Sequence, residues 1–513
     1  MTQGFITESL TTGLIRGVSH NEVDFFLGIP YGQTTAGAGR WRAATPSAPW
    51  AGVRDCLQFG HIAPQIDGRL YATGSWPQVA DLMYPQGGSP IEGGTISEDC
   101  LVVNVWRPTA ATGALPVMVW LHGGGYGHGA GSETIFSGDQ IARTGRAIVV
   151  SVNHRLGILG HLELGGVLGE GYAGSGQLGL TDLVLALEWV HDNIAALGGD
   201  PSNVTIFGQS GGAAKVGSLL AMPAARGLFA RAIMQSGPLA WFASPEQVEQ
   251  TTTAVLDLLG LSRDQAGMLL DLPLDYLMHV QHLAESAGIT WAPSVDGAVV
   301  AERPFADEGL EPWADVPLLI GSTSHELSLM LVSEPWYDVL DESTLVEAVA
   351  QIHGENAAQV VTRYTAEFPN DNPSLTFARV QTDASITRSV VKGAGIKSRQ
   401  PGAVYAYRFA YETDAHDRKL GAAHSLDLPF VFGTVTRSPF AGQKLDRIEV
   451  SQRMLDAWVS FAETGSPATS SIPAWPPYDE TDRSTMVIDS EWAVIAGPTL
   501  AELPAGASLW PDD

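Results

Sequence analysis

The chain has 513 residues, of which 45% are hydrophobic and 16% are charged, as in a large globular protein. Its 56 acidic and 28 basic residues give a formal net charge of −28, which disfavours nucleic acids and anionic membrane surfaces as partners because phosphates attract cationic side chains. Only two cysteines occur, which excludes a small secreted scaffold that depends on several disulfides.

The N-terminal residues 1–8 (MTQGFITE) contain neither a basic segment nor an apolar segment, so they do not resemble a signal peptide. No apolar run approaches the roughly 18 to 20 residues that a bilayer span needs. We therefore expect a cytoplasmic protein, from a bacterium, that does not insert into a membrane. No linker, low-complexity tract or repeat divides the sequence, which predicts a single domain over residues 1–513.

The first strong structural signal is residues 115–121 (LPVMVWL), a short apolar run typical of a buried strand, which opens into the glycine-rich stretch 122–127 (HGGGYG). Consecutive glycines let backbone N–H groups point at one spot, as an oxyanion hole requires. We predict Gly124 and Gly125 as two of its donors. A dinucleotide-binding loop is disfavoured, because the acidic residue expected about 20 positions later is absent.

The second signal is Ser210, the only serine with glycine at both the −2 and the +2 position, in the pentapeptide GQSGG. An apolar stretch, residues 204–207 (VTIF), precedes this pentapeptide and a helix-forming stretch, residues 213–222, follows it. Strand, G-x-S-x-G and helix in this order predict a nucleophile elbow, in which the N–H of the next residue, Gly211, is a third oxyanion donor. Because the chain has 57 glycines, this context carries more weight than the pentapeptide alone.

Strand and helix patterns alternate along the chain, which predicts an α/β fold with a mainly parallel sheet covered by helices. Besides the two strands above, the expected strands are residues 147–152, 232–235, 316–320 and 404–411. Residues 244–287 are rich in Leu, Asp and Gln at helical spacing. We expect them to form a cap-like insertion over the active site that contributes to substrate selectivity.

Several further motifs occur in the order typical of one family: residues 26–31 (FLGIPY), 97–101 (SEDCL), 153–157 (NHRLG) and 179–182 (GLTD). On these motifs, the chain resembles the type B carboxylesterase (cholinesterase-like) family of α/β-hydrolases over nearly its whole length. The resemblance implies the α/β-hydrolase fold, with a central sheet flanked by helices and helical insertions.

The resemblance also implies the other two members of a catalytic triad. Residues 321–326 (GSTSHE) are similar to the segment that carries the family's acid, which makes Glu326 the acid. Residues 421–433 (GAAHSLDLPFVFG) are similar to the histidine segment, which makes His424 the base. We expect His325, beside the acid, to be structural or to line the site, and Asp427 to support the histidine loop.

The reaction implied is acyl transfer to water through a Ser210 acyl-enzyme, on neutral carboxylic esters as small-molecule substrates. Carbamate or amide hydrolysis stays an alternative, because a triad and an oxyanion hole do not distinguish the leaving group. A more remote alternative is a binding protein, since this fold includes adhesion proteins that lack the serine. We expect no cofactor, and no metal because the H-x-H, H-E-x-x-H and C-x-x-C spacings are absent.

Two departures from the family pattern concern the elbow. Gln209 stands where Glu is usual before the serine, and Gly211 stands where Ala is common. A neutral Gln209 disfavours a positive charge on the neighbouring His424 and weakens the case for cationic, choline-like substrates.

Further contacts are implied by the resemblance. Relatives usually form a disulfide between a cysteine at the position of Cys100 and a second cysteine at the position of Ala63. This chain has alanine at that second position, so the only bridge left open is a different one, between Cys56 and Cys100. The resemblance also implies two structural ion pairs, Arg40 with Glu98 and Arg155 with Asp182.

Overall fold

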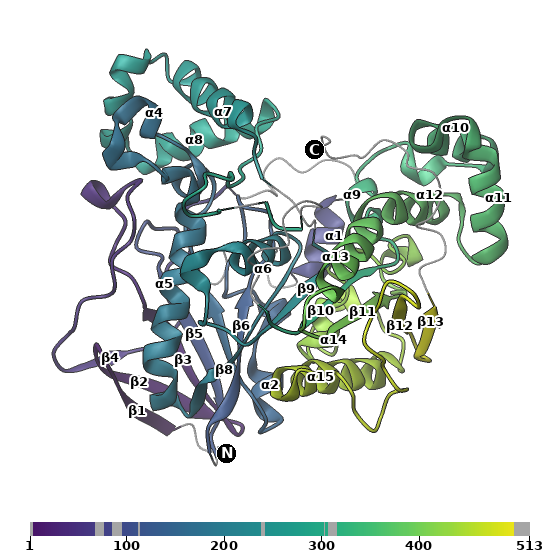
Figure 1. Ribbon diagram of the computed structural model, residues 1–513, viewed down its shortest axis with the longest axis horizontal. Helices are drawn as coiled ribbons and strands as arrows, with labels where there is room; N and C mark the ends of the chain where they lie inside the picture. The colour runs from purple at the N-terminus through teal and green to yellow at the C-terminus, as the bar shows by residue number, and fades with distance from the viewer. Residues whose placement is uncertain are drawn as a thin grey trace.

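A single large sheet organises the protein (Figure 1). The computed structural model describes residues 4–66, 76–84, 95–110, 113–237, 242–301, 303–305 and 315–496. Within these ranges the sheet has thirteen strands in the order β1-β2-β3-β5-β7-β6-β8-β9-β10-β11-β12-β13, with β4 paired to β2. The strands are β1 (Gly4–Leu10), β2 (Gly13–His20), β3 (Val23–Pro30), β4 (Val53–Asp55), β5 (Val102–Pro108), β6 (Leu115–Leu121), β7 (Ile148–Val152), β8 (Gly199–Gln209), β9 (Arg231–Gln235), β10 (Leu318–Thr323), β11 (Val404–Phe409), β12 (Ser484–Ile488) and β13 (Ala493–Ala496).

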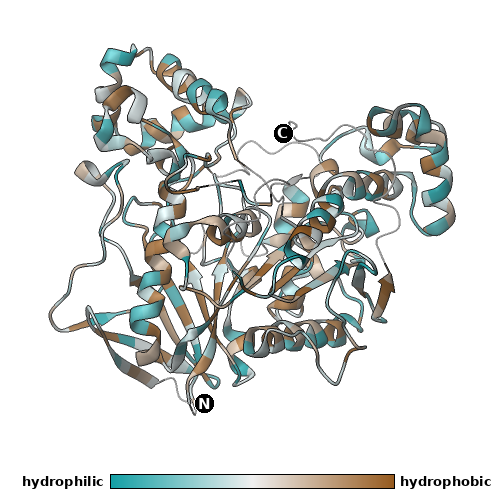
Figure 2. Ribbon diagram, viewed as in Figure 1, coloured by the Kyte–Doolittle hydropathy of each residue, from teal (hydrophilic) through white to brown (hydrophobic). Residues whose placement is uncertain are grey.

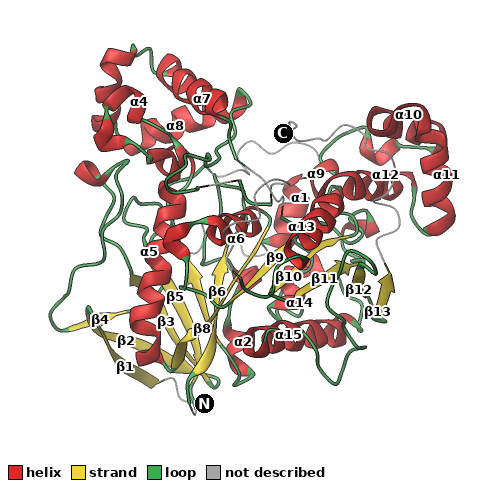
Figure 3. Ribbon diagram, viewed as in Figure 1, coloured by secondary structure: helices red, strands yellow, loops and turns green. Residues whose placement is uncertain are grey.

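The helices lie on both sides of this sheet and above it (Figure 3). They are α1 (Trp76–Met83), α2 (Asp139–Arg143), α3 (Gly157–His161), α4 (Gly165–Leu168), α5 (Leu178–Asn193), α6 (Gly211–Ala221), α7 (Pro245–Leu258), α8 (Leu274–Ser286), α9 (Ser328–Leu331), α10 (Glu342–His353), α11 (Ala357–Glu367), α12 (Pro373–Thr382), α13 (Arg388–Ser398), α14 (Leu428–Val431) and α15 (Arg447–Thr464).

The central strands β7, β6, β8, β9, β10, β11 and β12 are parallel to one another. On one side of them β1, β2, β3 and β5 form an antiparallel extension that joins β7, and on the other side β13 is antiparallel to β12. All six strands expected from the sequence are present in the parallel part. The structure extends β8 back to Gly199 and ends β10 later, at Thr323. The sheet is therefore mixed, with its parallel part around the elbow.

Side chains that alternate along β6 enter two separate cores. Val117, Val119 and Leu121 pack on the side of α5 and α6, whereas Met118 and Trp120 pack on the side of α15. Both faces of the strand are covered, which explains why the sequence of β6 is uniformly apolar instead of alternating with polar residues. The strand β6, which leads into the glycine-rich stretch, is thus buried on both faces.

Two groups of helices stand at opposite upper corners of the molecule in Figure 1. One contains α7, α8 and the 3₁₀ segment Arg263–Asp271, which all fall inside residues 244–287. The other contains α10, α11 and α12, which enclose a small core of their own around Tyr337, Val349 and Tyr364. Hydrophilic and hydrophobic segments alternate along these outer helices (Figure 2), as expected for helices with one buried face. Among the described residues, no helix is long and apolar enough to cross a bilayer.

The ion pairs implied by the family resemblance are both present and buried. The Arg40 guanidinium donates to Glu98 at 2.7 and 2.6 Å. Arg155 donates to Asp182 at 2.8 and 2.6 Å, and the backbone N–H of Arg155 donates to the same carboxylate at 3.1 Å. The two cysteines are also buried, but both are free thiols, so the bridge left open by the sequence does not form.

Replacing Arg155 with alanine is expected to lower the free energy of unfolding by about 3 to 5 kcal/mol, because Asp182 is then left as a buried charge without its partner. Urea unfolding measures this change. The control is Arg16→Ala, which breaks the exposed Arg16–Asp55 pair and is expected to change the free energy of unfolding far less, because solvent screens that pair. Equal losses in the two variants would contradict a special role for the buried pair.

Candidate active site

Ser210 occupies the turn between β8 and α6, and its backbone has φ 58° and ψ −125°. This conformation is strained for a residue with a side chain, and such strain is typical of a nucleophile elbow. The backbone N–H of Ser210 donates to the carbonyl of Gln235, at the end of the neighbouring strand β9, at 2.8 Å. The serine is half-buried, so the turn presents its side chain at the surface of the core.

The elbow glycines are required by close packing against the glycine-rich stretch after β6. A Cβ atom on Gly211 would lie 2.6 Å from the backbone nitrogen of Gly125 and 2.3 Å from its oxygen. A Cβ atom on Gly212 would lie 2.0 Å from the carbonyl oxygen of Leu121. Gly124 and Gly125 adopt φ values of 80° and 61°, which favour glycine. The three predicted oxyanion donors therefore lie on two segments in direct contact.

The predicted base and acid meet in the interior. The Nδ1 atom of His424 lies 2.5 Å from Oε2 of Glu326, and both side chains are buried. The other carboxylate oxygen of Glu326 accepts the backbone N–H of Thr323 at 2.7 Å, so the carboxylate is fixed at both ends. With Nδ1–H donated to Glu326, the Nε2 atom of His424 carries the free lone pair.

The partner of that lone pair is Gln209, the residue before Ser210. Its side-chain amide donates to His424 Nε2 at 3.1 Å, and Gln209 is itself buried. Among the described residues, Ser210 makes no hydrogen bond to His424. The structure thus brings His424, Glu326 and the elbow together, with the Gln209 amide at the nitrogen that a general base would use. Hydrogen bonds of catalytic groups are often incomplete before substrate binds.

Gln209→Glu is expected to move the acidic limb of the kcat/KM profile to higher pH. A carboxylate at this position favours the protonated imidazolium of His424, so the inactive, protonated form persists to higher pH. The measurement is kcat/KM against pH for the variant and the wild type. Gln359→Glu, on the exposed side of α11, adds the same charge far out on a peripheral helix and should leave the limb in place. An unmoved limb in Gln209→Glu would refute the effect.

The Asp427 side chain hydrogen-bonds to residues of β9 and β11, as expected for a residue that supports the histidine segment. Its Oδ2 atom accepts hydrogen bonds from Gln235 at 2.8 Å and from the Tyr407 hydroxyl at 3.0 Å. Burial raises the pKa of Asp427 to about 6. Because Gln235 also accepts the N–H of Ser210 through its carbonyl, Asp427 links the histidine segment to the elbow.

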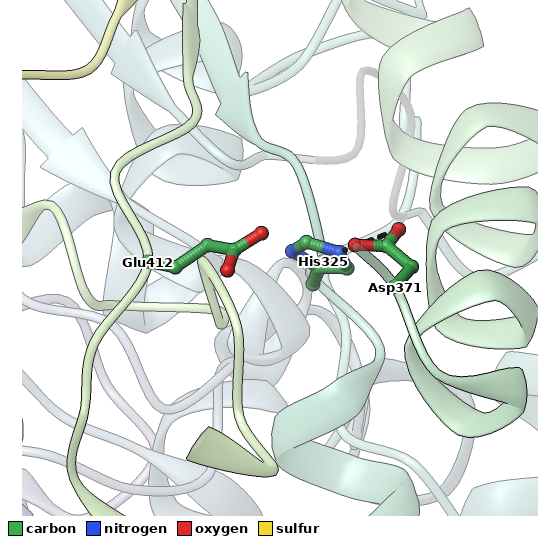
Figure 4. A group of neighbouring side chains, drawn as sticks. All are labelled: His325, Asp371 and Glu412. Atoms are coloured by element: carbon green, nitrogen blue, oxygen red, sulfur yellow. Dashed lines mark hydrogen bonds and ion pairs between the residues drawn. The ribbon is translucent and has the colours of Figure 1, made fainter. Parts of the chain in front are cut away.

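The side chain of His325, which we expected to be structural or to line the site, lies between Asp371 and Glu412 (Figure 4), and His325 also contacts Ala422 of the histidine segment. Its Nδ1 atom accepts the backbone N–H of Ala422 at 3.0 Å, and its own backbone N–H donates to the Ala422 carbonyl at 2.9 Å. The Nε2 atom lies 3.3 Å from Asp371. Burial lowers the pKa of His325 to about 4, so the ring stays neutral and Nε2–H is the donor to Asp371.

His325, Asp371 and Glu412 lie close enough together to suggest a metal site, because one ligand atom from each falls within 4.8 Å of the others. The chemistry of the cluster argues against this function. The lone pair of Nδ1 already accepts Ala422 N–H, and Nε2 carries a proton. The guanidinium of Arg379, 2.6 Å from Asp371 and 3.8 Å from Glu412, already supplies a positive charge to both carboxylates.

Comparisons with known proteins cover nearly the whole chain. The model of a family described as the carboxylesterase family matches residues 6–501. The chain is 35% identical over 510 residues to a para-nitrobenzyl esterase of Bacillus subtilis (strain 168), with 97% of each chain covered. It is 32% identical over 507 residues to a phenmedipham hydrolase of Pseudarthrobacter oxydans, with 95% of each covered. The crystal structure of a Geobacillus stearothermophilus carboxylesterase matches with a TM-score of 0.80 at 33% identity, over 96% of this chain and 98% of that chain. The expected α/β-hydrolase fold is confirmed.

Proposed function

The chain belongs to the carboxylesterase family and is a serine hydrolase of carboxylic esters, and from this premise we propose that Ser210, Glu326 and His424 form its catalytic triad. The observation that carries the proposal is the 2.5 Å contact between His424 and Glu326, on a histidine that also contacts the residue next to Ser210. This arrangement supports a base that is oriented by an acid and lies beside the elbow that carries the serine.

In the first step, the Oγ atom of Ser210 attacks the ester carbonyl while His424 Nε2 accepts its proton. The Gln209 amide leaves Nε2 for this transfer. His424 then returns the proton to the departing alcohol, which gives an acyl-enzyme. Water attacks the acyl-enzyme with His424 again as the base, so that the carboxylic acid is released and Ser210 is regenerated. Glu326 holds the tautomer and stabilises the imidazolium throughout.

The negative charge that develops on the carbonyl oxygen needs donors on the opposite side of the reacting carbon. We assign this role to the backbone N–H groups of Gly124, Gly125 and Gly211. The close approach of Gly211 to Gly125 and the position of Gly211 at the first turn of α6 support the assignment, because helix N-termini leave N–H groups unpaired.

We propose that the leaving group is an alcohol, so that the substrates are esters. Hydrolysis of carbamates or amides is the alternative. Neither the triad nor the oxyanion donors distinguish these substrates, and the relative from Pseudarthrobacter oxydans is described as a phenmedipham hydrolase. Phenmedipham therefore belongs in the substrate panel beside simple esters.

The experiment is a substrate panel combined with active-site labelling. Para-nitrophenyl acetate, butyrate and octanoate, the matching anilides, and phenmedipham are assayed for turnover and for a pre-steady-state burst. We expect the esters to turn over fastest, with a burst from the acyl-enzyme. A fluorophosphonate is expected to label the peptide that contains Ser210. Faster turnover of anilides or phenmedipham would favour the alternative, and a label on another residue would overturn the triad.

Two further parts of the proposal concern organisation and location. We propose that residues 1–513 form one domain, in which residues 244–287 act as a cap over the active site and contribute to substrate selectivity. The presence of α7 and α8 in this range supports the idea. We also propose a cytoplasmic location in a bacterial cell, which the two free, buried cysteines support.

A further inference from the structure

The helix that follows the elbow carries a buried lysine. Lys215, on α6 five residues after Ser210, has no exposed surface. Burying an ammonium group is costly unless the protein supplies partners, so such lysines are rare in structures. Burial lowers the pKa of Lys215 to about 7, against an opposing effect of Glu133. The triad mechanism does not use this group.

The contacts of Lys215 surround the glycine-rich stretch after β6. Its Nζ atom donates to the carbonyl of His122, which precedes the three glycines, at 3.0 Å. The same atom lies 5.7 Å from the ring centroid of Tyr126, which follows the three glycines. The ammonium is therefore hydrogen-bonded at the start of the segment that carries Gly124 and Gly125 and lies over the aromatic ring at its end.

Glu133 completes this arrangement at the far end of the same loop. Its carboxylate accepts the backbone N–H of Ala130 at 3.0 Å, and its negative charge favours the ammonium form of Lys215. Burial raises the pKa of Glu133 to about 7. The titratable groups that face Lys215 or interact with it electrostatically are Glu133, His122, His154, His161 and Tyr126.

We propose that Lys215 is a positioning residue for the oxyanion hole: its ammonium fixes the His122 carbonyl, orients the N–H groups of Gly124 and Gly125, and adds positive charge behind them. This inference rests on the proposed function, since it assumes that these glycines bind the oxyanion. Glycine peptides are flexible, so a charge-assisted hydrogen bond at their first residue selects one orientation. A neutral ester gains little from the nearby charge, whereas the tetrahedral oxyanion gains much in a low-dielectric site. Loss of the Lys215 ammonium is therefore expected to lower kcat and to leave KM nearly unchanged.

The first test is Lys215→Met, which keeps the length and removes the charge and the donor. We expect kcat per labelled active site to fall about 10- to 100-fold with KM changed less than about threefold, since one direct oxyanion donor accounts for about 10² to 10³. The inhibition constant of a trifluoromethyl ketone, which forms an oxyanion on Ser210, is expected to rise by the same factor. We expect the melting temperature to change little, because removal of a buried charge offsets the lost hydrogen bond.

The matched control is Lys397→Met. Lys397 is also buried, and its Nζ donates to Gln400 at 2.6 Å, but it lies on α13, beside β10 and β11. Its replacement should leave kcat per active site and the inhibition constant unchanged. If Lys215→Met lowers only the number of labelled sites, or changes KM instead of kcat, Lys215 is a structural anchor and the inference is overturned.

Glu133→Gln provides an independent measurement that does not depend on the folding of Lys215→Met. The amide oxygen of the new side chain can still accept Ala130 N–H, but the amide no longer favours the ammonium, so Lys215 should lose its proton at lower pH. The alkaline limb of the kcat profile is expected to move to lower pH, and an unmoved limb would overturn the role of the charge.

Ser210→Ala is assayed in parallel to separate this inference from the proposed triad. An active Ser210→Ala enzyme refutes the triad. An inactive Ser210→Ala enzyme together with an unchanged kcat in Lys215→Met refutes only this inference.

Discussion

Replacing Ser210 with alanine is expected to lower kcat by about 10⁶-fold while the protein stays folded. Alanine occupies the strained backbone of the elbow, φ 58° and ψ −125°, at the same cost as serine, and the N–H of residue 210 still donates to Gln235. The loss is therefore chemical: without Oγ, no acyl-enzyme forms, and only the oxyanion donors and substrate binding contribute. The measurement is single-turnover and steady-state hydrolysis of para-nitrophenyl butyrate, with circular dichroism to verify the fold.

The control for this variant is Ser460→Ala. Ser460 is a buried serine on α15 whose hydroxyl donates to the Ser466 and Ala468 carbonyls at 3.0 and 2.9 Å. Its loss should change stability slightly and leave kcat within about twofold. Activity of Ser210→Ala within about tenfold of the wild type would place the nucleophile elsewhere.

The second large effect is expected for Glu326→Gln, with a fall in kcat of about 10⁴-fold. The Glu326 oxygen that accepts Thr323 N–H can be replaced by the amide oxygen of Gln. That bond turns the amide NH₂ toward His424 Nδ1, which must then accept instead of donate. The remaining imidazole proton moves to Nε2, where the ring can no longer receive the proton of Ser210. The variant is expected to keep its KM, since substrate does not contact the acid.

Asp427→Asn separates this effect from the general loss of a buried carboxylate. Asp427 lies in the histidine segment but accepts hydrogen bonds from Gln235 and Tyr407. Its replacement should therefore lower the melting temperature and reduce kcat by at most about tenfold. A larger fall in kcat for Asp427→Asn than for Glu326→Gln would reverse the assignment of the acid.

The sequence predicted the parallel centre of the sheet well and its margins poorly. Residues 115–121 were recognisable as a strand because both faces are buried and every position is apolar. The N-terminal strand β1 has the burial pattern exposed, exposed, half-buried, exposed, half-buried, exposed, buried, so its hydrophobic signal is weak. The helices α10 to α12 were also not predicted as a unit, since their core around Tyr337 and Tyr364 forms only when distant segments meet.

The candidate site followed from local patterns only in part. The elbow and the glycine-rich stretch are continuous motifs, whereas Glu326 and His424 could be selected only by family resemblance, from many acidic and histidine residues. The contacts that now matter most, Gln209 with His424 and Lys215 with His122, join residues far apart in sequence. One signal for Lys215 was present: it is the single charged residue in the helix-forming stretch 213–222, which small and apolar residues otherwise fill.

The neutral histidines around the active site have a consequence for an enzyme whose product is an acid. Burial holds the pKa of His161 at about 3 and that of His325 at about 4, and it lowers the pKa of His122 and His154 well below the usual value. When the pH falls below about 6.5, these rings take up protons in the unfolded chain but not in the folded chain, so their contribution to the free energy of unfolding decreases until the folded pKa values are reached. Each ester hydrolysed releases a carboxylic acid. In a weakly buffered solution, sustained turnover therefore drives the enzyme toward an acidity at which these four histidines destabilise its fold.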